Sequence, residues 1–158
     1  MGNIFAGSEI VRIGVQIEKN GRDFYNTLAK QSQNQAAVGV FKFLAGEEEK
    51  HILIFRKILD RLEEYVPSEA YPGEYIAYMN TLAGGYVFTR RDKGEEIAKK
   101  IKTDPQAIEM ALGFEKDSII FYEGMKALVP EYDLKVIGAL IAQEQLHLVQ
   151  LTDLKRII

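Results

Sequence analysis

The sequence contains no cysteine. Its 158 residues therefore form no disulfide, no thiolate-ligated zinc site and no iron–sulfur or rubredoxin-type centre. Any metal or redox chemistry within this chain has to use oxygen and nitrogen ligands. Electrons for such chemistry would have to arrive from a separate partner protein.

Long apolar runs and a basic surface are missing as well. Although 47% of the residues are hydrophobic, no apolar run reaches the roughly 18 residues that a membrane span needs. The first residues lack the charged start and uninterrupted apolar stretch of a signal peptide, so we expect a cytoplasmic protein. The net charge is −3, and the lysines and arginines are scattered. We therefore expect no membrane partner and no nucleic-acid partner.

Histidine is scarce, and both copies stand in the same context. The two histidines each follow a glutamate by three residues, in the pairs Glu48–His51 and Glu144–His147. Three residues correspond to about 300° of helical turn, so the two side chains of a pair point the same way from one helix. One such pair would be weak support for a metal site, but two matched pairs are strong support.

A further glutamate precedes each pair. Glu18 stands 30 residues before Glu48, and Glu115 stands 29 residues before Glu144. Each of these four glutamates interrupts an apolar stripe of helical period. A carboxylate in such a stripe is costly to bury unless it is paired or binds a metal ion.

Four long helical segments carry these residues. Their expected ranges are about 8–31, 35–65, 105–128 and 131–157. Ser8, Asn34 and Thr103 are suited to cap the first three helices, and Pro130 separates the third from the fourth. Residues 66–103 are expected to form a long crossover with short helices near residues 74–82 and 95–101.

The two halves of the chain repeat one layout, since residues 17–25 match residues 114–122 in pattern. We predict an all-α protein in which residues 1–158 form one domain, an antiparallel four-helix bundle of two helical hairpins joined by the crossover. A pseudo-two-fold axis between the hairpins would bring six side chains together in the core. They are Glu18, Glu48, His51, Glu115, Glu144 and His147.

Four carboxylates and two imidazoles inside a bundle predict a di-metal site. Oxygen and nitrogen ligands of this kind favour iron first and manganese second, with zinc as a further alternative. Either the two glutamates paired with histidines or their two upstream counterparts would bridge the metals, and the spacing leaves both choices open.

Two tyrosines stand in equivalent places. Tyr25 and Tyr122 each lie seven residues after an upstream glutamate. They are candidates to donate hydrogen bonds to ligating carboxylates, which would give them a supporting role at the site. Packing in an amphipathic core is the alternative interpretation.

The pattern resembles the ferritin-like superfamily of di-iron carboxylate proteins, and within it the rubrerythrin-like branch. The resemblance covers essentially the whole chain. Four segments carry it: Ile17-Glu18-Lys19, Glu48-Glu49-Lys50-His51, Phe114-Glu115-Lys116 and Glu144-Gln145-Leu146-His147. The resemblance implies a ferritin-like bundle, two Fe ions held by the six residues, and tyrosines beside them at positions 25 and 122.

The sequence departs from that family in two respects. Rubrerythrins typically end in a cysteine-ligated rubredoxin domain, and this chain has no cysteine. They also tend to carry an extra carboxylate one turn from the ligand of the third helix, where this chain has Leu112 and Ser118. These departures leave a symmetric site of six ligands.

Two classes of function fit these observations. The first, favoured largely by the resemblance, is a di-iron oxidoreductase of the peroxidase or ferroxidase type that acts on Fe(II), hydrogen peroxide or dioxygen. The second is a non-catalytic bundle that its metal ions hold together. Di-manganese and oxygenase-type variants are further alternatives.

The partners we expect follow from this reading. They are metal ions, a small oxidant, a separate electron-donor protein for any reductive reaction, and a second copy of the chain. We expect a homodimer whose interface includes the aromatic crossover.

Overall fold

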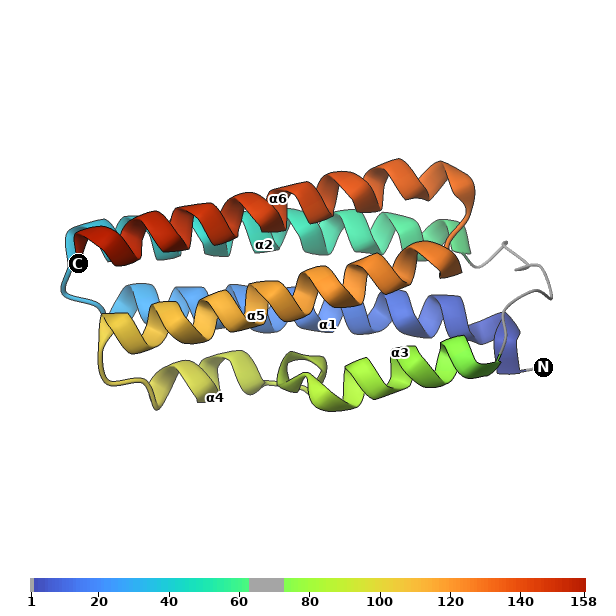
Figure 1. The fold of residues 1–158 in the computed structure, drawn as a ribbon, viewed down its shortest axis with the longest axis horizontal. Helices are drawn as coiled ribbons and strands as arrows, with labels where there is room; N and C mark the ends of the chain where they lie inside the picture. Colours follow the sequence, from blue (N-terminus) through green and yellow to red (C-terminus); the bar gives the residue numbers. More distant parts are fainter. Residues whose placement is uncertain (1, 63–72) are drawn as a thin grey trace.

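The computed structural model describes residues 2–62 and 73–158, which form helices and connecting turns (Figure 1). The elements in chain order are α1 (Gly2–Gln31), α2 (Gln35–Leu62), α3 (Gly73–Gly85), the 3-10 turn η1 (Val87–Thr89), α4 (Lys93–Lys99), α5 (Asp104–Met125), the 3-10 turn η2 (Lys126–Leu128) and α6 (Glu131–Ile157). The described ranges contain no strand, so the all-α prediction is confirmed.

The four long helices form a bundle of two hairpins. Helices α1 and α2 run antiparallel, as do α5 and α6, and the hairpins lie side by side with α1 next to α5 and α2 next to α6 (Figure 1). The crossover runs the length of the bundle, with α3 against α5 and α4 against α1. The predicted antiparallel four-helix bundle with a long crossover is therefore confirmed.

The helix ends agree with the sequence in some places and differ in others. Asn34 accepts a hydrogen bond from the Ala37 amide at 3.0 Å, and Thr103 accepts one from the Gln106 amide at 3.3 Å, so both act as the predicted caps. The predicted end of the second helix, residues 63–65, lies outside the described residues. The third helix ends at Met125 and tightens into η2, rather than continuing to residue 128 as an α-helix.

The start of the first helix was predicted wrongly. Helix α1 begins at Gly2, so Ser8 lies inside it and is not its N-cap. Gly7, in the part of the helix before Ser8, packs directly against η2. A Cβ added at Gly7 would lie 2.8 Å from the carbonyl oxygen of Leu128, so this packing needs a glycine.

The two expected short helices of the crossover are present as α3 and α4. Buried Asn20 on α1 fastens α4 to the bundle. Its side-chain oxygen accepts hydrogen bonds from the amides of Lys93 and Gly94 at 3.0 Å each, and its nitrogen donates to the carbonyls of Phe88 and Arg90. Asn20 thus caps a helix that lies more than seventy residues later in the chain.

Aromatic rings hold the middle of the crossover. Phe88 of η1 packs against Phe24 of α1 and Phe114 of α5, with ring centroids 5.6 and 4.1 Å apart. Tyr86 stacks on Phe88 and lies next to Phe114 as well. The crossover is therefore packed into the bundle by apolar contacts, beside the level of Glu115.

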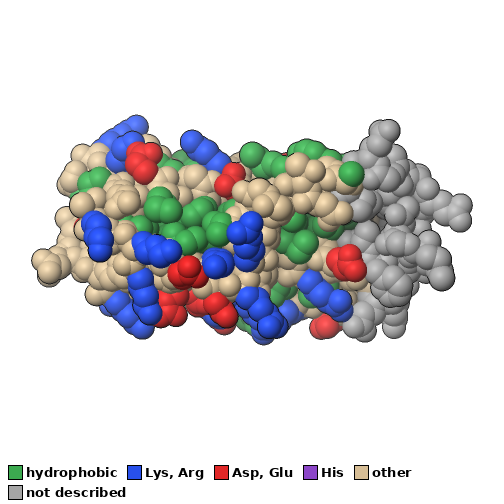
Figure 2. All heavy atoms as spheres, turned by 90° about the horizontal axis from the view of Figure 1, so that it is seen from below, with side chains coloured by type: hydrophobic (Ala, Val, Ile, Leu, Met, Phe, Trp, Pro, Cys, Tyr) green, Lys and Arg blue, Asp and Glu red, His purple; other side chains and the backbone are tan. Residues whose placement is uncertain are grey.

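The outer face of the crossover is mixed in character. Hydrophobic side chains are exposed in the middle of this face, among lysines, arginines and acidic residues (Figure 2). Among the described helices, none is both long enough and apolar enough to cross a membrane.

Candidate metal centre

Each of the four bundle helices contributes one glutamate to the middle of the core. The two histidines come from α2 and α6, each one turn after the glutamate of its own helix. None of these six side chains belongs to a residue more than 4% exposed. The six are Glu18, Glu48, His51, Glu115, Glu144 and His147.

The six side chains form two overlapping groups. In the first, Glu18, Glu48, His51 and Glu144 each offer one ligand atom, and these atoms all lie within 4.8 Å of one another. In the second, the same holds for Glu48, Glu115, Glu144 and His147. Glu48 and Glu144 belong to both groups.

The atoms of the first group point at a common centre more than at each other. His51 Nδ1 lies 2.9 Å from a Glu144 oxygen and 3.5 Å from a Glu18 oxygen. The directions nevertheless do not suit hydrogen bonds: His51 Nδ1, Glu144 Oε1 and Glu18 Oε2 are buried without a hydrogen-bond partner among the described residues. Buried polar atoms left this way are costly, and a cation held between them would satisfy all three. The donor set therefore fits a metal ion.

The second group is built in the same way. His147 Nδ1 lies 3.1 Å from Glu144, 3.5 Å from Glu115 and 3.6 Å from Glu48. The two imidazole rings are nearly parallel, with centroids 5.9 Å apart. Each ring thus presents Nδ1 to its own group of carboxylates.

Gln143 fixes the orientation of His51. The Nε2 atom of His51 lies 2.5 Å from the side-chain oxygen of Gln143 on α6, so Nε2–H donates to that oxygen. This contact leaves Nδ1 as the nitrogen that faces the carboxylates, as metal-binding histidines require. Gln143 was not predicted from the sequence, because its partner lies 92 positions away on another helix.

The two tyrosines bond across the hairpins. The hydroxyl of Tyr25 donates to Glu115 at 2.7 Å, and the hydroxyl of Tyr122 donates to Glu18 at 2.6 Å. Each tyrosine therefore contacts the glutamate of the neighbouring helix rather than the one seven residues earlier on its own helix.

Helix geometry explains this crossing. Side chains on an α-helix lean toward its N-terminus, so each tyrosine leans back toward the level of the carboxylates. Seven residues correspond to about 10 Å of rise, which leaves the glutamate of the same helix too far away. Since α1 and α5 run antiparallel, the tyrosines approach the centre from opposite ends. Both sit in the core, at no more than 2% exposure.

In the metal-free protein, protons balance part of the negative charge. Burial disfavours a charged His51, but Glu18 and Glu144 outweigh it and raise its pKa to about 11. Burial likewise opposes a charged His147, whose pKa is nevertheless raised to about 10 by Glu115 and Glu144.

The carboxylates respond in opposite directions. Burial, together with the charge of Glu144, raises the pKa of Glu115 to about 8. Burial and the charge of Glu18 also oppose ionisation of Glu144, but hydrogen bonds from its neighbours lower its pKa below the ordinary value. A buried cluster with this many perturbed groups is typical of a functional site.

A small space opens against the carboxylates. It has a volume of about 10 Å³, room for one water-sized molecule, and Glu48 and Glu115 form part of its wall. Gly21 borders it, and a Cβ added there would lie 3.4 Å from the Glu48 side chain. Ser118 and Tyr86 border it on the other side.

Comparison with known families agrees with this geometry. The family model of Rubrerythrin matches residues 9–155. The chain belongs to the rubrerythrin family. The chain also resembles the crystal structure of a protein from Thermotoga maritima that is described as a candidate ferritin-like diiron-carboxylate protein. The two chains are 28% identical, with a TM-score of 0.69, and the match covers 96% of this chain and 95% of the other. No curated protein matches the chain.

These comparisons confirm the resemblance predicted from the sequence. The protein has a ferritin-like diiron-carboxylate fold with a buried cluster of glutamate and histidine, and membership of this family implies metal-ion binding. Ser118, like Leu112, lies one turn from Glu115, and neither position carries a further carboxylate. Ser118 borders the small space at the carboxylates. It is buried, and its hydroxyl lies 2.9 Å from that of Tyr86.

Proposed function

We propose that this protein is a di-iron oxidoreductase that oxidises Fe(II) with hydrogen peroxide or dioxygen. Glu18 and His51 would hold one iron ion, and Glu115 and His147 would hold the other. Glu48 and Glu144 would bridge the two ions, since these two residues belong to both groups of ligand atoms. Manganese and zinc suit the same ligands and remain alternatives for the native metal.

Two iron ions bound side by side supply the two electrons that reduce a peroxide to water. The protein's own residues fix and shield that pair. Tyr25 and Tyr122 each hold one carboxylate by a hydrogen bond, and burial of all six side chains limits access of water. Overall, oxidation of two ferrous ions by one hydrogen peroxide consumes two protons and yields two waters.

The observation that carries this proposal is the small space against Glu48 and Glu115. A purely structural metal site is closed by its protein ligands, whereas a catalytic site keeps a position open for a water or substrate. Room for one water-sized molecule at the carboxylates supports a reactive centre over a structural one.

Anaerobic loading with Fe(II), followed by rapid mixing with hydrogen peroxide or with dioxygen, tests the proposal. We expect an absorbance increase from ferric iron that is much faster than for free Fe(II) under the same conditions. If iron-loaded protein reacts with neither oxidant, while metal removal unfolds the bundle, the structural function would replace the one proposed.

Ligand variants test the assignment of residues independently. Glu48→Ala and His147→Ala should each lose at least one ion per chain in elemental analysis. Glu49→Ala is the matched control, because Glu49 is exposed and pairs with Arg22 on the surface. Unchanged metal content in both ligand variants would contradict the assignment. The same analysis on protein purified without added metal identifies the native ion.

The electron donor and the oligomeric state complete the proposal. Any reductive cycle would use a separate donor protein, because the chain has no cysteine-ligated centre. We also propose a homodimer. Exposed apolar side chains support it, including Phe43 on α2 and Leu146 and Val149 on α6. A molar mass measured by light scattering that equals one chain at micromolar concentration would contradict the dimer.

A further inference from the structure

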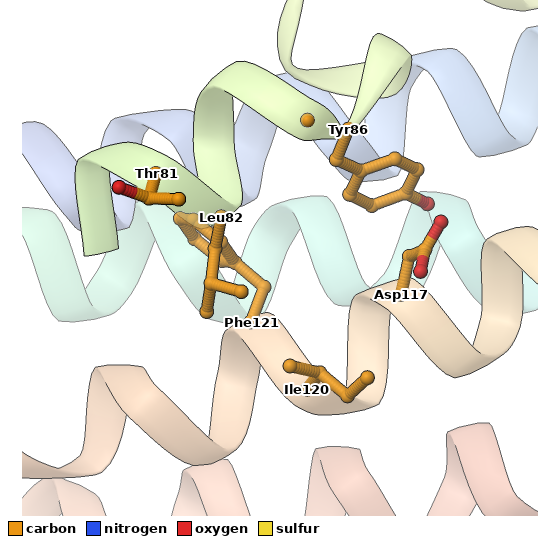
Figure 3. Close-up of a pocket in the computed structure, with 7 residues that line it drawn as sticks. Thr81, Leu82, Tyr86, Asp117, Ile120 and Phe121 are labelled. Atoms are coloured by element: carbon orange, nitrogen blue, oxygen red, sulfur yellow. The ribbon is translucent and has the colours of Figure 1, made fainter. Parts of the chain in front are cut away.

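A second, larger hollow lies on the surface where the end of α3 meets α5. Its volume is about 170 Å³, and its walls include Leu82 and Gly85 of α3 and Ile120 and Phe121 of α5. Figure 3 shows this hollow, with Tyr86 at one end and its hydroxyl directed toward Asp117. Asp117 is exposed, so this end of the hollow faces solvent.

Tyr86 borders both this hollow and the small space at the carboxylates. One part of its side chain contributes to the outer wall, and the same residue lines the inner space with Ser118, Glu48 and Glu115. Its ring is 4% exposed and stacks on Phe88. Tyr86 therefore stands between the outer hollow and the small space at the carboxylates.

Two hydrogen bonds hold Tyr86 in this position. Its hydroxyl donates to the carbonyl oxygen of Phe114 at 2.9 Å, and the Ser118 hydroxyl lies at the same distance and can donate to it. Both partners belong to α5, whereas Tyr86 belongs to the crossover. The crossover is thus attached to α5 at the point where the two spaces meet.

We propose that the hollow between α3 and α5 is the access route by which a small uncharged oxidant reaches the metal centre, with Tyr86 as its gate. This inference rests on the proposed function and names the path that its oxidant takes. It assigns a role to the crossover, which contributes none of the six candidate ligands.

The dimensions and chemistry of the route select its ligand. The inner space holds about one water-sized molecule, so a hydrated metal ion does not fit there. The rings of Phe88, Phe114 and Tyr86 form much of its wall, together with Ile17. Dioxygen and hydrogen peroxide are small and uncharged, and they match both features. The expected route is therefore one for oxidant, while iron enters elsewhere.

Adjacent glycines provide a matched pair of variants. Gly85 borders the hollow and Gly84 does not, and a Cβ added at either would meet nothing within 4 Å. Gly85→Phe should fill the hollow without disturbing the fold, and Gly84→Phe is the control of equal bulk. Tyr86→Phe should instead open the route, because it keeps the ring but removes both hydrogen bonds that hold Tyr86 in place.

The first measurement needs no redox activity. In zinc-loaded protein under oxygen pressure, dissolved dioxygen should enhance nuclear relaxation of the methyl groups of Ile120 in the hollow and Ile17 at the inner space. Gly85→Phe should abolish the enhancement at Ile17, and Gly84→Phe should retain it. An Ile17 enhancement that survives in Gly85→Phe, or is absent from the unaltered protein, would overturn the proposal.

The second measurement uses iron-loaded protein and separates the two oxidants. Gly85→Phe should slow oxidation of bound Fe(II) by about tenfold or more, and Tyr86→Phe should accelerate it. Slowing with dioxygen and not peroxide, or the reverse, identifies which oxidant uses the route. Equal rates in Gly85→Phe and Gly84→Phe with both oxidants would refute it. Absence of any oxidation in the unaltered protein would instead refute the proposed function, and the relaxation experiment would still decide the route.

Discussion

Metal binding to this cluster should release protons, and the structure indicates how many. At pH 7 the metal-free protein holds one proton on His51 and one on His147 beyond those of neutral imidazoles, since their pKa values are raised to about 11 and 10. Glu115, with a pKa of about 8, is mostly protonated as well. All three side chains must lose these protons before they bind a cation.

We therefore expect about three protons released per chain when both metal positions fill at pH 7. At pH 8.5 Glu115 is already largely ionised in the metal-free protein, so the number should fall to slightly more than two. Because each released proton favours the metal-bound form as the pH rises, the apparent dissociation constant should fall about tenfold per pH unit for each of them.

Calorimetric titration with Mn²⁺ measures the count directly. At a fixed pH, the observed enthalpy is plotted against the ionisation enthalpy of several buffers, and the slope is the number of protons released. The same titration at pH 8.5 serves as the control, because Glu115 is already largely ionised there and fewer protons should be released. A slope near zero for the unaltered protein would mean that these groups carry no protons for a metal to displace. The interpretation of the cluster as a charge-balanced ligand set would then be wrong.

Four further predictions test the surroundings of the cluster. Tyr122→Phe removes the hydrogen bond to Glu18 and should lower the free energy of unfolding of the metal-free protein by about 1–3 kcal/mol, measured with urea; Tyr132→Phe, at an exposed position, should have no effect. Gln143→Leu removes the hydrogen bond to the ring of His51 and should weaken metal binding about 10- to 100-fold. The control Gln145→Leu, on the exposed side of α6, should leave the affinity unchanged. Equal affinities of the two variants would exclude a role for Gln143 in orienting His51 for metal binding. Asn20→Ala removes four hydrogen bonds to the crossover and should lower the free energy of unfolding by about 2–4 kcal/mol. Elemental analysis should still find two ions bound per chain. Loss of metal with unchanged stability would contradict our assignment of a structural role to Asn20. Gly21→Ala should raise the melting temperature, because alanine favours a helix over glycine by about 1 kcal/mol. The added methyl group should also slow oxidation of bound Fe(II), because it narrows the space beside Glu48. An unchanged oxidation rate would show that the reaction does not use this space.

The sequence was sufficient for the parts of the structure that follow from helical periodicity. A glutamate and a histidine three positions apart share one face of a helix wherever that helix lies, so the pairs on α2 and α6 could be identified without coordinates. The matched spacing of Glu18 and Glu115 then predicted which helices meet. Caps such as Thr103 are similarly local, because donor and acceptor lie within one turn.

The parts that escaped prediction depend on contacts between distant segments. Gln143 orients His51 across 92 positions, and Asn20 caps α4 across more than seventy. Such contacts depend on how the helices are rotated and aligned against each other, which periodicity does not specify. The close packing of Gly7 against Leu128 escaped prediction for the same reason, because it joins residues far apart in the chain.

The space beside the carboxylates follows from the internal repeat of the chain. In the matched halves, Gly21 stands three residues after Glu18 and Ser118 stands three residues after Glu115, so the two are equivalent positions. Both are small, and both border the space at Glu48 and Glu115. A carboxylate at position 118 would fill that volume with another potential ligand. The small pair instead leaves room for a molecule that the protein does not supply, and Tyr86 closes it from the crossover side. Where a carboxylate at position 118 would add a seventh protein ligand, Ser118 thus leaves a position that an exogenous ligand can reach.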